Sequence, residues 1–323
     1  MRVSAYIGSV LGLLILVYLG VHAHLGDMLS ALEAGGLPLL WLLPYRALFF
    51  VLYAIGWGEL LRPSDPMRRA GFGYIFWATT VRDAVDRLLP VASVGGSIVG
   101  VRIVQWRGIA GAPVAASVII EILLTLIVIY LFTALGIVLL AEYGATAHEF
   151  RRLVLVFLLS LPIPVIVALL LKNGAVASRL QGLVRSWAGE GAVVRGVSSV
   201  DEEVRASLHR PRALVIAGSL QFIALLSGAF EIWFSLRLFA HPVSVSAALM
   251  LESMTQAVRH LAFVVPAGIG VQEAGLVLFG QAVGVSSDLA LAVAMVKRLR
   301  ELAWGVPTLL SWQWQEGRRL RRA

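Results

Sequence analysis

Largely uncharged stretches of about twenty apolar residues recur along this chain, and they limit its possible folds more than any other feature. A helix of about twenty apolar residues spans the hydrocarbon core of a bilayer. Hydrophobic residues make up 59% of the sequence and charged residues 14%, whereas soluble domains carry roughly 25% charged residues. The sequence therefore predicts an all-α polytopic membrane protein, and it excludes a soluble enzyme, a disulfide-rich secreted domain and a disordered chain.

The apolar stretches predict six full transmembrane helices. These are Ser4–Val21, Leu37–Leu61, Val114–Ala141, Leu153–Leu171, Arg212–Ala240 and Ser287–Trp312. Two further segments, Phe72–Pro113 and Val243–Val285, are broken by proline and glycine and carry too many charges for clean spans. The breaking residues are Pro90, Gly95, Gly96, Pro266, Gly268 and Gly270. Broken backbone at membrane depth must be buried in protein or line a wet cavity, so both segments are predicted to be re-entrant.

Basic residues predict the orientation of the chain. They concentrate at Arg2, at Arg62–Arg69, in the long polar stretch 173–211 and in the tail 315–323, and the formal net charge is +8. An excess of Lys and Arg marks the cytoplasmic side of a membrane. We therefore expect a multi-pass protein of the bacterial cytoplasmic (inner) membrane with both termini in the cytoplasm. Within the polar stretch, Ser199–Glu202 is expected to cap the start of a short helix.

The two halves of the chain resemble each other around Pro90 and Pro266, each of which follows an apolar run and precedes a pair of glycines. When these two prolines are aligned, Glu121 corresponds to Lys297. The sequence predicts a single integral membrane domain over 1–323, with pseudo-repeat halves of about 1–141 and 153–312. Because the halves have opposite predicted orientations, they form an inverted repeat, an arrangement typical of transporters that bind cargo near the midplane.

Charged residues inside predicted membrane segments are the candidate functional residues, since an isolated charge there is unfavourable and needs a partner. The candidates for a headgroup or ion site are Glu121, Arg259, Glu273, Lys297 and Arg298. Three more residues, Arg82, Asp86 and Arg87, are candidates for a gate that contacts lipid phosphate. The alternative is structural: the pairs Arg82–Asp86, Asp83–Arg87 and Lys297–Glu301 are four residues apart on a helix and would neutralise each other.

A family resemblance rests on the motif Pro266-Ala-Gly-Ile-Gly-Val-Gln-Glu273, followed by Arg298 in the last span. With Leu89-Pro90 and Gly95-Gly96 in the first half, it resembles the lysylphosphatidylglycerol synthase transmembrane-region family of flippase-like proteins. The segments Arg82–Pro90 and Ser93–Ser97 look most like the subgroup associated with hopanoid biosynthesis. The resemblance implies a lipid-handling membrane protein, whose partners are membrane lipids, either hopanoid-related or anionic phospholipid.

Two departures from the family pattern occur in the first half. Ser97 follows Gly96 where many members have an acidic residue, and Ile122 follows Glu121 where they often have arginine. An ionic contact of the family is therefore not expected here. The aminoacyl-transfer domain of the synthases has no counterpart in this sequence, so lysyl transfer is not expected.

The main functional hypothesis is a flippase-like transporter that moves an amphipathic lipid through a polar cavity between the inverted halves. One alternative is a non-catalytic scaffold that docks lipid-biosynthesis enzymes on the loop 173–211, and another is a lipid-modifying transferase. The sequence contains no recognisable nucleotide-binding, metalloprotease or nucleophile motif, and it has no cysteine. We expect no catalytic residues, no metal or other cofactor, and no nucleic-acid partner.

Overall fold

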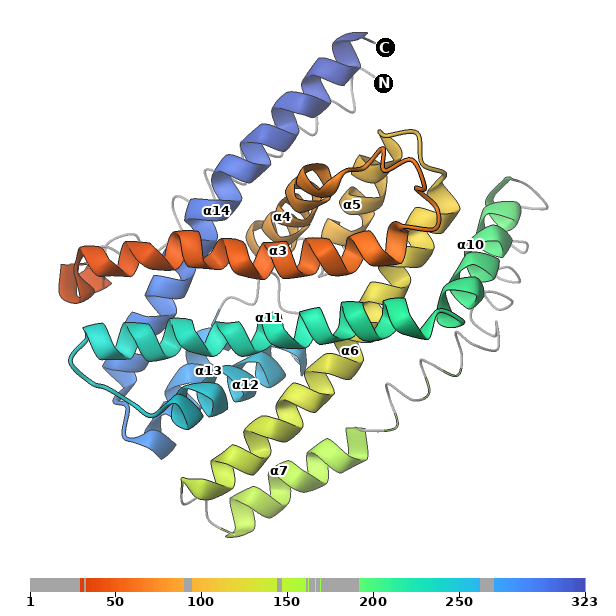
Figure 1. The fold of residues 1–323 in the computed structure, drawn as a ribbon. Helices are drawn as coiled ribbons and strands as arrows, with labels where there is room; N and C mark the ends of the chain where they lie inside the picture. The colour runs from red at the N-terminus through yellow and green to blue at the C-terminus, as the bar shows by residue number, and fades with distance from the viewer. Residues whose placement is uncertain are drawn as a thin grey trace. The chain divides into compact units, whose positions relative to one another are not determined.

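The computed structural model describes residues 30–31, 33–89, 95–143, 147–160, 162, 166, 169, 192–261 and 270–322. These residues form helices and connecting turns, and no strand occurs among them (Figure 1). The all-α prediction is therefore confirmed for the described part of the chain. The helices are η1 (Leu37–Trp41), α3 (Leu42–Leu61), α4 (Phe72–Leu88), α5 (Gly95–Gln105), α6 (Gly111–Glu142), α7 (Ala147–Ser160), α10 (Ala192–Leu208), α11 (Pro211–Leu238), α12 (Val245–Leu261), α13 (Val271–Gly280), η3 (Gln281–Val283) and α14 (Ser287–Arg322).

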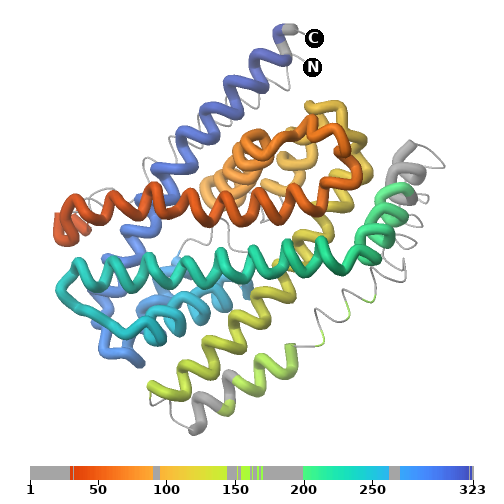
Figure 2. The backbone as a smooth tube through the Cα atoms, viewed as in Figure 1, coloured from red at the N-terminus to blue at the C-terminus, as the bar shows by residue number. Residues whose placement is uncertain are grey.

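Three described helices are long and apolar enough to cross a membrane. They cover Leu37–Leu61, Gly111–Glu142 and Pro211–Leu238, and they match three of the six predicted spans. The predicted span Ser4–Val21 lies outside the described residues, and so does part of Leu153–Leu171. The last predicted span belongs to α14, which continues through the basic tail to Arg322 as one helix (Figure 2). Because its central turns contain charged side chains, α14 is not one of the three helices that are apolar enough to cross a membrane.

The chain divides into two compact units. Unit 1 comprises 1–47, 79–99 and 229–323, and unit 2 comprises 48–78 and 100–228. Helices α3, α4, α5 and α11 each contribute residues to both units. The core clusters and the candidate functional site each lie within one unit.

Unit 2 is held together mainly by apolar packing between helices. Leu60, Ala116, Ile120, Val204 and Ala217 form a buried cluster in which α6 packs on α10. Two polar side chains elsewhere in unit 2 form hydrogen bonds: Trp57 Nε1 donates to Ser117 Oγ at 3.1 Å, and Tyr74 Oη donates to the Ile103 carbonyl at 2.7 Å. A buried indole N–H or phenol stabilises a core only when such a partner is present.

The predicted helix start at Ser199 is wrong. Helix α10 begins at Ala192, so Ser199 lies inside it and does not cap it. The residues before Ser199 are mostly apolar and continue the helical periodicity, and this pattern outweighs the local capping signal.

Unit 1 contains α12, α13 and α14, which follow one another in the sequence and pack together (Figure 1). Its apolar contacts include the buried cluster of Ala31, Leu39, Leu42 and Val296. A methyl group added at Gly275 of α13 would lie 3.4 Å from the Thr255 backbone of α12. The small residue therefore lets the two helices approach closely, as is common in membrane helix packing.

Both segments predicted to be broken contain a pair of short helices, α4 with α5 and α12 with α13. Residues 90–94 and 262–269, which hold Pro90, Pro266 and Gly268, lie outside the described part of the chain. Gly270 precedes α13 with φ 79°, a left-handed conformation that favours glycine. When Pro90 is aligned with Pro266, the first residue of α5 falls on that of α13, and the first residue of α6 on that of α14. The helix order therefore repeats at the offset of the two prolines.

Candidate functional site

The carboxylate of Glu301 lies at the centre of a group of arginine side chains in unit 1. Its side chain is 2% exposed, and Arg87 Nη1 donates to its Oε1 at 2.5 Å. Arg298 Nη1 donates to Oε2 at 3.1 Å. Arg259 Nη1 and Arg300 Nη2 each lie 3.8 Å from Oε1. A single carboxylate thus interacts with four guanidinium groups.

Further carboxylates extend this group. Asp83 Oδ1 accepts from Arg87 Nε at 2.7 Å and lies 3.6 Å from Arg46 Nη2. On the other side, Glu273 Oε1 accepts from Arg298 Nε at 3.0 Å. Glu231 Oε1 accepts from Arg300 Nη1 at 2.6 Å. We call these nine residues the Glu301 network: Arg46, Asp83, Arg87, Glu231, Arg259, Glu273, Arg298, Arg300 and Glu301.

The Glu301 network connects the two predicted pseudo-repeat halves. Arg46 comes from α3, and Asp83 and Arg87 come from α4, all in the first half. The other six residues come from α11, α12, α13 and α14 in the second half. All nine belong to unit 1. Because charges removed from water must be paired to be tolerated, these contacts fix the helices relative to one another within the unit.

Lys297 forms a separate buried ion pair with Glu252 of α12. Gln256 Nε2 donates to the other oxygen of Glu252 at 2.8 Å. The predicted neutralisation of Lys297 by Glu301 is therefore wrong, although the two residues are four apart on α14. Lys297 faces α12, whereas the arginines of three helices surround Glu301, so tertiary contacts decide both partners.

The candidate gate residues have distinct roles in unit 1. Arg87 belongs to the Glu301 network, and its predicted pair with Asp83 is present. Asp86 Oδ1 accepts from the Gly96 backbone N–H at 2.8 Å and so caps the start of α5. A methyl group at Gly96 would meet the Arg82 carbonyl and lie 2.5 Å from Asp86 Oδ2. The glycine is required there because the backbone of α5 contacts α4 directly.

Of the five residues predicted for the headgroup or ion site, four lie in unit 1. Arg259, Glu273 and Arg298 belong to the Glu301 network, and Lys297 lies one residue before Arg298 on α14. Glu121 lies in unit 2, buried on α6. The sequence analysis did not select Arg46, Glu231, Glu252, Arg300 or Glu301. Each is a charged residue within a mainly apolar helix, the same signal that identified the others.

Several polar atoms of the Glu301 network have no hydrogen-bond partner among the described residues. Among these atoms are Arg259 Nη1, Glu273 Oε2 and Arg300 Nε, and all three are buried. Buried donors and acceptors are normally satisfied. The network therefore retains the capacity to bind a polar group. Within the described part of the chain, no three His, Asp or Glu side chains are grouped so that they could hold a metal ion.

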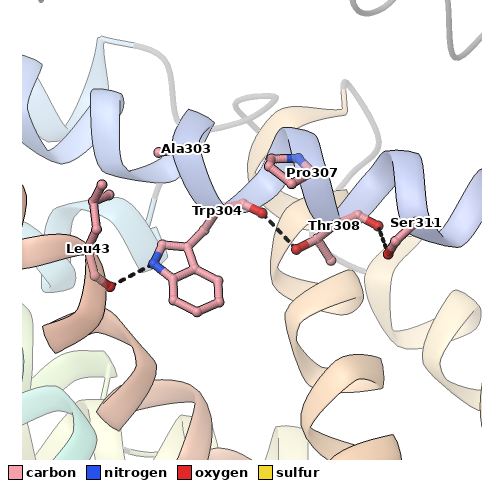
Figure 3. A pocket seen from close by; sticks show the side chains of 6 residues that line it. All are labelled: Leu43, Ala303, Trp304, Pro307, Thr308 and Ser311. Carbon is pink, nitrogen blue, oxygen red and sulfur yellow. Dashed lines mark hydrogen bonds between the residues drawn. The ribbon is translucent and has the colours of Figure 1, made fainter.

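An apolar pocket of about 390 Å³ begins two residues beyond Glu301 on the same helix (Figure 3). Leu43 lines it from α3, and Ala303, Trp304, Pro307, Thr308 and Ser311 line it from α14. Trp304 Nε1 donates to the Leu43 carbonyl at 2.9 Å, and Thr308 Oγ1 donates to the Trp304 carbonyl at 2.7 Å. Since the protein itself satisfies these polar groups, the lining suits an apolar ligand.

Comparison with known proteins gives one match. The model of the family described as lysylphosphatidylglycerol synthase TM region matches residues 6–310. The search of curated proteins and the search of solved structures each return no match.

Proposed function

The chain belongs to the lysylphosphatidylglycerol synthase TM region family, and from this premise we propose that it transports an amphipathic lipid across or within the cytoplasmic membrane. Family membership makes it a membrane protein linked to lipid metabolism or transport. The transport mechanism and the cargo are our proposal. The cargo is hopanoid-related, because the segments Arg82–Pro90 and Ser93–Ser97 resemble the hopanoid-associated subgroup.

The observation that carries the proposal is the position of the Glu301 network beside an apolar pocket. Glu301 and Trp304 are three residues apart on α14, and side chains at this spacing lie on one face of a helix. A lipid has a polar headgroup and an apolar body. The network offers unsatisfied buried donors and acceptors for the headgroup, and the pocket offers an apolar surface for part of the body.

The residue roles follow from these contacts. Arg259, Glu273 and Arg298 bind the headgroup, and the Lys297–Glu252 pair holds α14 against α12 beside them. The predicted gate consists of Arg82, Asp86 and Arg87. Because Arg87 also contacts Glu301, it connects the gate to the headgroup site. Glu121 provides a second polar position along the path of the lipid.

The proposal also specifies how the chain is arranged in the membrane. Residues 1–323 act as one integral membrane domain, with six spans, two re-entrant segments and both termini in the cytoplasm. Its two halves, about 1–141 and 153–312, form an inverted repeat. The three apolar helices support this arrangement, and so does the helix order that repeats at the offset of the two prolines.

A proteoliposome assay tests the transport proposal. Purified protein is reconstituted with a fluorescent lipid, and a membrane-impermeant quencher measures how much of the lipid changes leaflet. We expect transport by the wild type and its loss in Glu273→Gln, which folds because Arg298 keeps Glu301 as a partner. Glu33→Gln, a change at an exposed residue, is the matched control and should transport normally.

The alternatives predict other results in the same preparation. A lipid-modifying transferase would change the mass of the lipid, which mass spectrometry of the extracted lipid detects. A scaffold would show no transport, and its function in cells would depend on the loop 173–211. Either result would contradict the transport proposal.

A further inference from the structure

Lys297 is the only lysine in the described part of the chain, and its side chain is 5% exposed. Its ammonium group contacts Glu252 Oε2 and so joins α14 to α12 inside unit 1. The cations of the Glu301 network are all arginines, and a guanidinium group stays protonated in proteins. A buried lysine can release its proton, because desolvation favours the neutral amine. Among the described Lys and Arg residues, Lys297 is therefore the one that can exchange a proton.

Glu252 is the proton acceptor that faces this lysine. Gln256 Nε2 donates to Glu252 Oε1 at 2.8 Å, and Lys297 donates to Oε2, so both carboxylate oxygens are engaged. The pair has no net charge when both groups are ionised. It also has none after the Lys297 proton has moved to Glu252, and that neutral form avoids the cost of burying two charges. A proton can therefore move within the pair without leaving a net charge in the core of unit 1.

Most charged groups around the Lys297–Glu252 pair are held by partners of their own. Arg300 acts electrostatically on Glu252, but its Nη1 donates to Glu231 Oε1 at 2.6 Å. His260 is exposed near the end of α12, and its Nδ1 lies 2.8 Å from the Gln256 carbonyl. The charged and titratable neighbours on α11, α12, α13 and α14 are Glu231, Arg259, His260, Glu273, Arg298, Arg300 and Glu301. All except His260 belong to the Glu301 network, whose carboxylates each contact an arginine. His260 is therefore the residue to control for in any pH measurement.

The helix repeat places a second titratable residue at the position of Lys297. When Pro90 is aligned with Pro266, Lys297 corresponds to Glu121. Each residue lies ten positions after the first residue of its helix, α14 or α6, and each is 4% exposed. In the proposed inverted repeat, equivalent positions lie at equal depths from opposite sides of the membrane. Each half therefore holds one buried group at this position that can exchange a proton.

We propose that the Lys297–Glu252 pair passes one proton through unit 1 in each transport cycle, so that a proton gradient drives the movement of the lipid. This inference rests on the proposed function and names its energy source. A proton from one side binds to the Glu252 carboxylate and breaks the ion pair, and Lys297 Nζ then releases its own proton to the other side. Transfer of the Glu252 proton to Nζ restores the pair. The pair joins the two helices whose arginines, Arg259 and Arg298, bind the headgroup, so breaking it changes how these arginines are held.

Transport under an imposed pH gradient tests the inference. The full chain is reconstituted into phosphatidylcholine vesicles that contain a fluorescently labelled hopanoid, and the impermeant quencher reports how the hopanoid is distributed between the leaflets. If one proton moves with each lipid and the membrane potential is held at zero, a gradient of about one pH unit should change the ratio between the leaflets roughly tenfold. A protonophore should abolish this asymmetry. Equal amounts in both leaflets of wild-type vesicles under the gradient would overturn the inference.

Lys297→Arg separates proton exchange from helix packing. Arginine keeps the ion pair with Glu252 but does not release its proton, so lipid should still change leaflet but without asymmetry driven by the gradient. An asymmetry retained in this variant would overturn the inference. If thermal unfolding shows that Lys297→Arg misfolds, the double variant Lys297→Gln/Glu252→Gln decides, because it leaves neither partner of the pair as an unpaired charge. It should lose the asymmetry, and retaining it would mean that the pair serves only helix packing.

His260→Gln is the matched control, because it removes a titratable group of α12 that lies outside the pair. It should keep the asymmetry of the wild type. Its loss in this variant would assign the proton to His260 and overturn the inference.

The same vesicles separate this inference from the proposed function. Lipid movement that the gradient does not affect would leave the function standing and overturn the proton coupling. Absence of any lipid movement would contradict the function, and proton entry measured with enclosed pyranine would then decide the proton site. Proton entry that Lys297→Arg abolishes would support the site, and absence of such entry would overturn it.

Discussion

The two helix pairs, α4 with α5 and α12 with α13, begin their second helix in different ways. In the first pair, the Asp86 carboxylate accepts the Gly96 N–H, and the backbone of α5 contacts α4 directly. In the second pair, Gly270 turns the chain into α13 without a side-chain cap. Arg259, which corresponds to Asp83 when the two prolines are aligned, lies 3.8 Å from its carboxylate contact, Glu301. The first pair is therefore joined by the Asp86 carboxylate of its first helix, whereas in the second pair the acidic residue lies on the second helix and contacts α14.

The two helix pairs therefore follow the same helix order but stabilise the start of their second helix in different ways. A helix N-terminus is stabilised by a negative group, either a side chain or a bound anion. The first pair uses Asp86, so α5 needs no ligand there. The second pair instead carries an acidic residue, Glu273, in the first turn of α13 itself, where it accepts from Arg298 of α14. Substitutions in both pairs, and at the carboxylate that joins them, test this difference.

Glu301→Gln should give the largest loss of stability. Glu301 interacts with Arg87 of the first pair and Arg259 of the second, and its side chain is 2% exposed. Removing one partner of a buried ion pair costs about 3–5 kcal/mol, and here one carboxylate serves four arginines. We expect loss of that size in thermal or denaturant unfolding of the purified protein, or failure to accumulate.

Glu59→Gln provides the control for the Glu301 variant. Glu59 pairs with Arg62 at 3.4 Å on the surface, where such pairs contribute about 0–1 kcal/mol. If both variants lose the same stability, Glu301 does not hold the network together.

Alanine at Gly96 and at Gly270 should have different effects. At Gly96 the new methyl group would meet the Arg82 carbonyl and the Asp86 carboxylate, so we expect a loss of about 3 kcal/mol from overpacking and from the broken cap. At Gly270 nothing lies within 4 Å of the added atom, and only the left-handed conformation is unfavourable, at about 1–2 kcal/mol. Unfolding of the two variants side by side measures this difference, and equal losses would contradict it.

Replacing Asp86 tests the cap itself. Asp86→Ala removes the acceptor of the Gly96 N–H, and losing an N-terminal cap costs about 1 kcal/mol. Asp86→Asn keeps an acceptor oxygen and should retain most of the stability. Unfolding midpoints of the two variants distinguish the hydrogen bond from the charge, since a purely electrostatic role would make them equally unstable.

Sequence periodicity predicts much of this fold, because long apolar runs and breaks in them are local properties. The spans Leu37–Leu61, Val114–Ala141 and Arg212–Ala240 agree with described helices to within a few residues. Both segments predicted to be broken contain a pair of short helices, and their re-entrant course stays a prediction. The helix start at Ser199 fails because a local capping pattern competes with a longer apolar periodicity, and the longer pattern prevails.

The candidate site is only partly predictable. Sequence selects Arg259, Glu273, Lys297 and Arg298 because a charge inside an apolar segment is unusual. It does not identify their partners, which come from helices distant in the sequence: Lys297 pairs with Glu252, and Glu301 pairs with Arg87, 214 residues away. Spacing on one helix instead favours Lys297 with Glu301. Tertiary packing determines which of the possible partners a charged residue contacts. The spacing of residues along one helix does not reveal that packing.

Arg259→Gln should have the smallest effect on stability. Its only described ion pair is 3.8 Å long, and without it Glu301 keeps its hydrogen bonds to Arg87 and Arg298. The substitution also gives the Glu301 network four arginines and four carboxylates. We therefore expect the free energy of unfolding to change by less than about 1 kcal/mol, well under the usual cost of breaking a buried pair.

Arg87→Gln is the comparison for Arg259→Gln, because Arg87 forms short contacts with both Asp83 and Glu301. It should lose about 3–5 kcal/mol, the cost of removing one partner of a buried pair. If denaturant unfolding shows that Arg259→Gln is equally destabilising, Arg259 belongs to the structural core of the network and the contrast between the two helix pairs fails. A stable Arg259→Gln that loses lipid transport would instead separate folding from function at a single residue, because Arg259 would then serve the cargo and not the packing of the helices.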